Sequence, residues 1–282
     1  MFEFTQVTKR YGKTIGLDEF SLAVSEPGIY CLLGKNGAGK TTMMRLLAGH
    51  IAATSGTVAA DGQLVGRLSM PHSVYYVEST ASQFNVRLDE LLAYAAKVNP
   101  GFDAEFARMM AQRFELDFRR RFRQLSFGMK TMVNTLLALA SGKDTLLLDE
   151  PVLGFDPVKR RTFYELLSEC CAERPKTVLV STHIIDEIER ASEQLLIIDH
   201  GQLKLYCSMA EIDEKAYCVV GPASQVVSAT DGLNIIGETT AGGFLSRSVF
   251  DRRVPQGDGY AITKLGLQDF FIGLVGDKRE EF

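Results

Sequence analysis

The stretch Gly34-Lys35-Asn36-Gly37-Ala38-Gly39-Lys40-Thr41-Thr42 decides the fold of this chain. It follows an apolar run, residues 29–33, that suits a buried strand, and it precedes a segment, residues 43–48, that suits a helix. A strand, a glycine-rich turn and a helix in this order form a phosphate-binding loop, G-x-x-x-x-G-K-[ST]. The glycines let successive N–H groups point at one anion, and the helix start adds the positive end of its dipole. We expect Lys40 to reach the β- and γ-phosphates of a nucleotide and the Thr41 hydroxyl to coordinate Mg²⁺.

Composition indicates a globular protein with a full hydrophobic core. The 282 residues are 46% hydrophobic and 23% charged, which suits one large domain or two smaller ones. No apolar run approaches the roughly 20 residues that span a bilayer, and the N-terminus lacks the pattern of a secretory signal. The five cysteines have neither metal-type nor disulfide-type spacing, which indicates a reducing compartment. We therefore expect a cytoplasmic protein, and the net charge of -4 argues against nucleic acid as its main partner.

Short apolar runs alternate with segments of helical periodicity over about the first 209 residues. This alternation predicts an α/β fold with a mostly parallel sheet covered on both faces. Further strands are expected at residues 2–7, 20–24, 74–77, 145–148, 177–181 and 195–198, with a short strand between turns within residues 54–62. Helices are expected at residues 87–98, 103–116, 125–140, 158–173 and 184–192.

From about residue 210 the character of the sequence changes. Glycine-rich turns separate short strand-like pieces at residues 217–220, 233–237 and 260–263, and residues 267–274 suit a short amphipathic helix. We therefore expect two domains, residues 1–209 and a small α+β accessory domain at residues 210–282.

Three polar side chains follow the apolar strands at the end where open α/β sheets bind their ligands. Asp149 and Glu150 come at the end of the strand at residues 145–148, and His183 follows the strand at residues 177–181. Nucleotide hydrolysis needs a carboxylate near Mg²⁺ and a group that polarises the attacking water. We expect Asp149 to serve the metal, Glu150 to polarise the water and His183 to bond a γ-phosphate oxygen. For Tyr11, stacking on an adenine and covering the sheet edge are both open interpretations.

These motifs, in this order, resemble the ATP-binding subunits of ABC transporters from Met1 to about Met209. The resemblance implies ATP and Mg²⁺ as cofactors, an antiparallel β subdomain, a helical subdomain at about residues 85–140, and a head-to-tail dimer around two ATP. Ser126 and Gly128, at the family's signature motif, would close on the γ-phosphate held by the other subunit. Tyr11 corresponds to the family's adenine-stacking aromatic residue, residues 34–42 to its Walker A motif and residues 146–150 to its Walker B motif. Residues 154–157, which include Asp156, correspond to the D-loop, and residues 181–183 to the motif of the switch histidine.

The chain departs from the family pattern at three places. Phe127 replaces the first signature glycine and Met129 replaces the signature glutamine, so a bulky side chain stands where the subunits would close. Glu78 stands where the family has the Q-loop glutamine; a carboxylate can also ligate Mg²⁺, and we expect Glu78 to do so. Val152 stands where threonine is frequent. Together these variants resemble the branch that serves ABC-2-type exporters, including bacitracin-type exporters.

The resemblance implies an ATPase without a pore of its own. It would act as a homodimer or with a related ATPase subunit, at the inner face of the cell membrane, and would drive a separate membrane-spanning subunit docked on the helical subdomain. Two alternatives remain open on the sequence: a non-transport ABC ATPase, and a regulatory nucleotide-binding subunit that hydrolyses weakly. Phe127 and Glu78 are the hints for the second.

Overall fold

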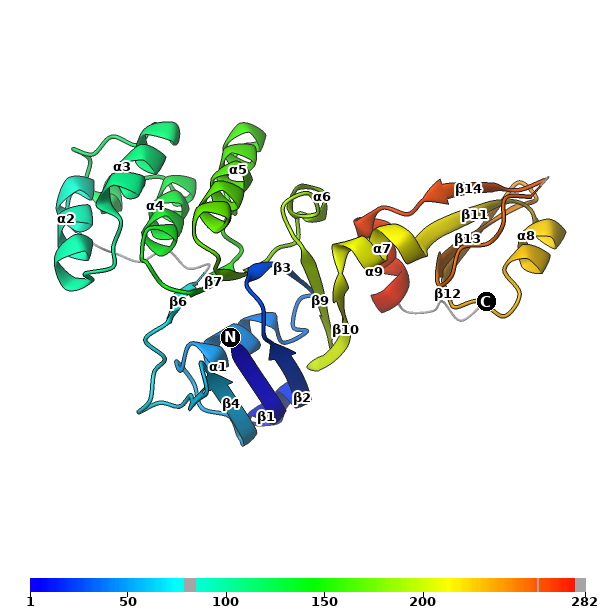
Figure 1. Ribbon diagram of the computed structural model, residues 1–282, viewed down its shortest axis with the longest axis horizontal. Coiled ribbons are helices and arrows are strands. Elements are labelled where there is room, and N and C mark those ends of the chain that lie inside the picture. Colours follow the sequence, from blue (N-terminus) through cyan, green and yellow to red (C-terminus); the bar gives the residue numbers. More distant parts are fainter. Residues whose placement is uncertain (79–84, 258, 277–282) are drawn as a thin grey trace. The chain divides into compact units, whose positions relative to one another are not determined.

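The computed structural model describes residues 1–78, 85–257 and 259–276. The chain forms two compact units, Met1–Leu205 and Tyr206–Phe282. The first unit contains the phosphate-binding loop, two sheets and most of the helices (Figure 1).

A six-stranded sheet runs through the first unit in the order β10-β9-β3-β8-β7-β6. Its strands are β3 (Gly28–Leu33), β6 (Val74–Val77), β7 (Thr145–Asp149), β8 (Thr177–Ser181), β9 (Gln194–Asp199) and β10 (Gln202–Ser208). The strands from β9 to β6 pair in parallel, and every residue of β3, β7 and β8 is buried. Their buried, mainly apolar sequences suit a sheet covered on both faces, as the sequence predicts. Because these strands are parallel, their carboxyl ends lie at one edge.

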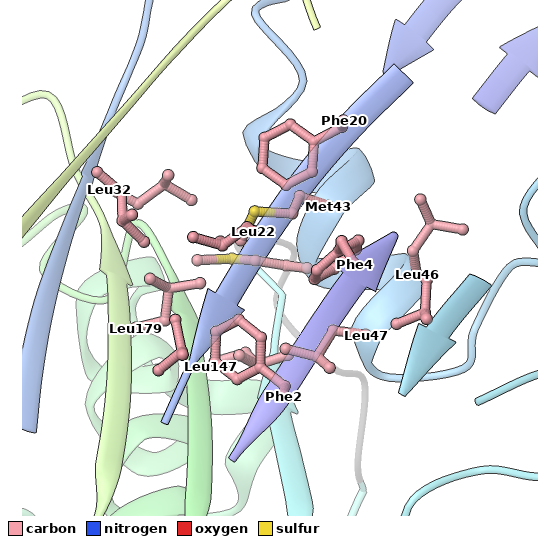
Figure 2. Close-up of a cluster of buried hydrophobic side chains, with 14 of the residues drawn as sticks. Phe2, Phe4, Phe20, Leu22, Leu32, Met43, Leu46, Leu47, Leu147 and Leu179 are labelled. Atoms are coloured by element: carbon pink, nitrogen blue, oxygen red, sulfur yellow. The ribbon is translucent and has the colours of Figure 1, made fainter. Parts of the chain in front are cut away.

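A second sheet has the order β2-β1-β4-β5 and is antiparallel. Its strands are β1 (Phe2–Tyr11), β2 (Thr14–Val24), β4 (Ser55–Ala60) and β5 (Gln63–Leu64). The hydrophobic core of the unit lies between this sheet, helix α1 (Lys40–Leu47) and the parallel sheet. Figure 2 shows Phe4 and Phe20 from the antiparallel sheet, Met43 from α1 and Leu147 and Leu179 from the parallel sheet in one cluster. This core fixes the start of α1 against the sheet edge.

The other helices of the first unit are α2 (Leu88–Val98), α3 (Ala104–Arg113), the 3₁₀ turn η1 (Phe122–Gln124), α4 (Phe127–Leu139), α5 (Pro157–Glu173) and α6 (Ile185–Ile188). Helices α2, α3 and α4 pack in sequence order, and α4 also packs on β6 and β7. Side chains at the N-caps define where three of them begin: Asp103 caps α3, Ser126 caps α4 and Asp156 caps α5.

The second unit has its own antiparallel sheet and its own core. Its elements are α7 (Met209–Lys215), β11 (Ala216–Pro222), α8 (Ala223–Ala229), β12 (Ile235–Ala241), β13 (Phe244–Phe250), β14 (Ala261–Lys264) and α9 (Leu267–Val275), with the sheet order β12-β13-β11-β14. Buried side chains of β11, α8 and β13 form the core, with Tyr217, Val226 and Val249 fully buried.

Several elements differ from the expectations drawn from the sequence. Strand β2 begins six residues earlier than expected, at Thr14, because it continues as a hairpin with β1. Helix α6 is only Ile185–Ile188, and the sequence does not predict β10, β13, α7, α8, the short strand β5 or the turn η1. Among the described residues, the helices are all too short or too polar to cross a membrane.

Candidate active site

The loop between β3 and α1 ends at Gly39, where the backbone adopts a conformation that only glycine accommodates. Gly37 and Gly39 have positive φ angles, +82° and +113°. A Cβ on Gly39 would lie 2.5 Å from the carbonyl oxygen of Gly16 and would clash with it. Gly39 is also the N-cap of α1 and provides no capping side chain, so the first turn of the helix is open to an anionic ligand. Lys35, Asn36 and Gly37 are exposed, whereas Ala38 and Gly39 are buried.

The ammonium group of Lys40 lies at this loop. Its Nζ donates to the carbonyl oxygen of Gly34 at 2.6 Å and to that of Lys35 at 3.3 Å. Burial lowers the pKa of Lys40, while the nearby carboxylates of Glu150 and Asp149 act in the opposite direction. Lys40 therefore carries a desolvated positive charge near two carboxylates, which suits it to bind phosphate.

Asp149 is buried at the carboxyl end of β7 and accepts hydrogen bonds from two hydroxyl groups. Thr41 Oγ1 donates to its Oδ2 at 2.8 Å, and Ser181 Oγ donates to its Oδ1. Ser181 reaches it because Asp149 and Ser181 are direct partners in the β7–β8 register. The Tyr76 hydroxyl lies 3.5 Å from Oδ2 as well.

Glu150 has an unusual backbone, with φ at +52°. Its N–H donates to the Ser181 carbonyl oxygen at 3.0 Å, which holds the chain in this left-handed conformation. His183 Nδ1 lies 2.8 Å from Glu150 Oε2. Burial raises the pKa of Glu150, the neighbouring His183 opposes that rise, and Asp149 adds to it. A carboxylate with a raised pKa at a sheet edge is suited to take a proton from water.

The oxygen atoms at this edge fit a hard divalent cation. Thr41 and Asp149 place a hydroxyl and a carboxylate side by side, and Mg²⁺ in nucleotide sites takes one or two protein oxygens in addition to phosphates. Within the described residues, there is no cluster of three or more His, Cys, Asp or Glu side chains that could hold a metal without the nucleotide.

Glu78, which we expected to ligate the metal, lies against an arginine. Arg45 Nε donates to Glu78 Oε1 at 2.7 Å, and a second guanidinium nitrogen of Arg45 donates to the same oxygen. The metal-ligand role of Glu78 stays a prediction, and the structure gives its carboxylate a different partner.

Tyr11 lies beside the first turn of α1. Its ring is 44% exposed, with the ammonium of Lys9 5.2 Å from the ring centroid. A Cβ on Gly16 would lie 2.9 Å from the Tyr11 ring and 3.0 Å from the Thr42 hydroxyl. The side chains of Tyr11 and Thr42 therefore both lie next to Gly16. An exposed aromatic ring at the edge of the loop is placed to stack on a base.

Ser126, Gly128 and Asp156 lie at the starts of α4 and α5. Ser126 Oγ accepts from the N–H of Met129 at 3.3 Å, and Asp156 accepts from that of Lys159 at 2.9 Å. A Cβ on Gly128 would lie only 2.4 Å from the carbonyl oxygen of Gly154. A glycine is therefore required at residue 128 within this chain, in addition to any approach of a phosphate.

The structure thus divides the predicted site residues into two groups. Lys40, Thr41, Asp149, Glu150 and His183 are joined by contacts or by charge interactions. In the parts of the chain that the structure describes, no hydrogen bond or ion pair joins this first group to Ser126, Gly128 or Asp156.

Three residues in contact with the site are not among the predicted site residues. Ser181 enters the sequence analysis only as part of the switch motif, and neither Tyr76 nor Arg45 belongs to a predicted site. Their contacts depend on the register of β6, β7 and β8 and on the face that α1 turns to the sheet. The one available signal is spacing: Arg45 follows Thr41 by one helical turn, and Tyr76 precedes Glu78 by two residues.

Comparison with known proteins identifies the family. The family model described as "ABC transporter" matches residues 17–153. The Nod factor export ATP-binding protein I of Paraburkholderia xenovorans (strain LB400) is 34% identical over 211 residues, which are 71% of this chain and 68% of that protein. The bacitracin transport ATP-binding protein BcrA of Enterococcus faecalis is 28% identical over 222 residues, which are 76% of this chain and 71% of that protein.

A solved structure shares the architecture of the chain. The structure titled "Structure of ATP binding subunit of ABC transporter" superposes with a TM-score of 0.67 at 25% identity, and the match covers 75% of this chain and 91% of that one. The predicted fold class and family are confirmed. The chain belongs to the ATP-binding subunits of ABC transporters and is an ATPase.

Proposed function

We propose that this chain is the ATPase subunit of an exporter, and that it closes head-to-tail with a second ATPase subunit around two ATP to drive a separate membrane-spanning protein. One observation carries the proposal. A carboxylate that suits Mg²⁺, a carboxylate that suits a catalytic base and a phosphate-binding lysine meet at one edge of the parallel sheet. This is the set of groups that ATP hydrolysis needs.

Each residue has a distinct task in the proposed reaction. Lys40 leaves its loop carbonyls to bind the β- and γ-phosphates, and its positive charge stabilises the negative charge of the transferring group. Glu150 Oε2 accepts a proton from the attacking water, and His183 keeps the Glu150 side chain in place through Nδ1. Thr41 and Asp149 would hold Mg²⁺, which neutralises phosphate charge when bound.

The separation of Ser126, Gly128 and Asp156 from the loop supports a site shared between subunits. Ser126 already caps α4, so the start of that helix is fixed and presents its positive dipole end to solvent. The side chain of Phe127 is 45% exposed beside it. A second subunit that places its phosphate-binding loop against this helix start would complete the site.

The exporter assignment rests on the relatives. Two of them are named for Nod factor export and for bacitracin transport, and both match most of this chain. The described part of the chain contains no helix that could form a membrane pore, so the proposal assigns the pore to a separate subunit and places this chain at the inner face of the membrane beside it.

The test uses ATP-dependent dimerisation. Glu150→Gln keeps the loop and removes the base, so we expect that variant to bind ATP, to lose at least about 99% of its turnover, and to run with ATP at about twice the 31.1 kDa of one chain in light scattering. Lys40→Ala is the control and should stay at the mass of one chain with ATP. Wild-type turnover in a folded Glu150→Gln protein would reject Glu150 as the base.

The membrane partner is tested by purification from membranes. We expect tagged protein to bring with it a protein that has several membrane-spanning helices, at a fixed ratio to the ATPase. Full recovery of the ATPase without such a protein, from membranes in which it is active, would favour a non-transport role.

A further inference from the structure

Four polar side chains form a chain of contacts that leads from the end of β6 to the metal-binding edge. Arg45 donates two hydrogen bonds to Glu78 Oε1, one of them at 2.7 Å. The positive charge of the Arg45 guanidinium also acts on the Tyr76 hydroxyl and lowers its pKa, against the effect of burial. That hydroxyl lies 3.5 Å from Asp149 Oδ2, the same oxygen that accepts from Thr41.

The spacing of these residues explains why they meet. Thr41 and Arg45 are four residues apart on α1 and therefore lie on one face of the helix. Tyr76 and Glu78 are two residues apart, on and just after β6, and therefore project from one face of the sheet. Thr41 and Arg45, on adjacent turns of α1, therefore face Tyr76 and Glu78 at the end of β6. Asp149 lies on the neighbouring strand β7.

The contacts fix the direction of the Tyr76 hydroxyl. The guanidinium is positively charged and has only donors, so it attracts the Tyr76 oxygen and directs the hydroxyl hydrogen away from itself. Asp149 Oδ2 is the acceptor at hand. The ring itself is held by an edge-to-face contact with His50, whose centroid lies 5.3 Å away.

We propose that Tyr76 and Arg45 are positioning residues for the metal carboxylate, and that Glu78 acts on the metal site through them rather than by ligating the ion. Glu78 holds the guanidinium group of Arg45, and this group orients the Tyr76 hydroxyl. The hydroxyl in turn sets the orientation of the Asp149 carboxylate, from the side opposite Ser181. The inference rests on the proposed function, because it assumes that Thr41 and Asp149 receive Mg²⁺ together with ATP.

The same contacts predict a dependence of metal affinity on residue 78. When Glu78 is paired with Arg45, the Arg45 guanidinium is held in place. The Asp149 carboxylate then has the hydroxyl groups of Thr41, Tyr76 and Ser181 around it. When the Glu78–Arg45 pair is lost, the Arg45 guanidinium is free to donate to other groups, and the Tyr76 hydroxyl loses its fixed direction. Outer partners of a ligating carboxylate commonly change metal affinity by about tenfold or more when removed.

The experiment measures metal affinity directly, with Mn²⁺ as the probe and the non-hydrolysable analogue AMP-PNP as nucleotide. Electron paramagnetic resonance titrations give the Mn²⁺ dissociation constant of each AMP-PNP complex. We expect Tyr76→Phe to raise this constant about 3- to 10-fold, at the low end because the contact is long, while AMP-PNP affinity in EDTA stays within about twofold.

Tyr75→Phe is the matched control. It removes one hydroxyl from the adjacent residue of the same strand, on the opposite face. Burial alone raises the pKa of Tyr75, without a contribution from the carboxylates that act on Tyr76. Its Mn²⁺ constant should equal that of the wild type.

Arg45→Lys tests the fork. A lysine retains the charge that pairs with Glu78 but lacks the planar guanidinium group that donates to Glu78 from two nitrogens. We expect Arg45→Lys to raise the Mn²⁺ dissociation constant as Tyr76→Phe does. The double variant, Arg45→Lys with Tyr76→Phe, should raise this constant by less than about a further twofold, because both changes break the same chain of contacts. Full additivity in this cycle would overturn the link through Arg45.

The outcomes separate this inference from the proposed function. If the wild type binds AMP-PNP and Mn²⁺, and Tyr76→Phe matches Tyr75→Phe in its Mn²⁺ constant, the positioning role is wrong and the proposed function stands. If the wild type binds no nucleotide, both are wrong. An Mn²⁺ constant raised by Glu78→Gln far more than by Tyr76→Phe would instead support direct ligation by Glu78.

Discussion

At the scale of single residues, Glu150 combines two features that cost stability. Its backbone has a positive φ, which is unfavourable for a residue with a side chain, and its carboxylate is desolvated beside Asp149. Bonds to Ser181 and His183 hold it in place. A residue kept in such a conformation by its surroundings is consistent with a reactive role, since the strain places the carboxylate at the end of β7.

The raised pKa of Glu150 gives a prediction for stability. A carboxyl group whose pKa is raised on folding contributes stability while it is protonated, and that contribution is lost as the pH rises through the folded-state pKa. At pH 8 the ionised group therefore opposes folding, and Glu150→Gln removes that charge. We expect the melting temperature to rise by about 1–3 °C at pH 8 in Glu150→Gln, and the gain to disappear by about pH 4, where both proteins are uncharged at this residue.

Differential scanning fluorimetry from pH 4 to pH 8 checks this expectation. Glu26→Gln, at an exposed carboxylate in the turn before β3, is the control and should change the melting temperature by less than about 1 °C. A melting temperature of Glu150→Gln at or below that of the wild type at pH 8 would show that the His183 contact outweighs the desolvation of the carboxylate.

The residues that the sequence predicted and those that it missed differ in one physical respect. Lys40, Asp149 and His183 each stand at the end of a strand or the start of a helix, and the parallel order of strands brings all such ends to one edge. Tyr76 lies inside a strand, and its role depends on which neighbour its hydroxyl meets across the sheet. Cross-strand register is not visible in local periodicity, so this contact required the structure.

At the scale of elements, the start of α4 and the loop before α5 form one closely packed piece. Gly128 lies in the first turn of α4, and Gly154 has a φ of +83° in the loop. Their backbones approach so closely that a Cβ on Gly128 would meet the Gly154 carbonyl oxygen at 2.4 Å. The start of α4 and the loop before α5 are therefore expected to move together.

Gly128→Ala tests this packing. The added methyl group must push the two backbones apart, and overpacking of this kind costs about 1–3 kcal/mol. We expect the melting temperature to fall by about 2–8 °C, with ATP affinity within about twofold, because Lys40 and Thr41 belong to other elements. Gly66→Ala, where an added Cβ meets nothing within 4 Å, is the control. An unchanged melting temperature in Gly128→Ala would refute the close packing.

Sequence periodicity predicted the elements of the first unit better than those of the second. Strands β7 and β8 are short and fully buried, and their central residues are all apolar, which leaves little ambiguity. Helices α7 and α8 have seven residues each, too few for a helical period to stand out. Strand β13 has three consecutive polar residues at its centre, Ser246, Arg247 and Ser248, so it lacks the alternation of a strand, and β11 and β12 pair with it on both sides.

At the scale of the whole molecule, each of the two units has a core of its own. The first core joins the antiparallel sheet, α1 and the parallel sheet, and the second joins β11, α8 and β13. A unit with its own core can fold without the other. We infer that the ATPase domain is separable from the C-terminal unit, and that every residue proposed to bind ATP belongs to the first.

A fragment of residues 1–208 tests this division. The cut follows Ser208 because β10 spans Gln202–Ser208 and forms the edge of the six-stranded sheet beside β9. We expect the fragment to unfold in one cooperative step and to bind ATP, by calorimetry, within about threefold of the full chain. A fragment of residues 1–200 loses β10 and exposes the hydrogen-bonding edge of β9, so it should melt at a lower temperature and aggregate more readily. Loss of ATP binding in a folded 1–208 fragment would mean that the C-terminal unit takes part in forming the nucleotide site.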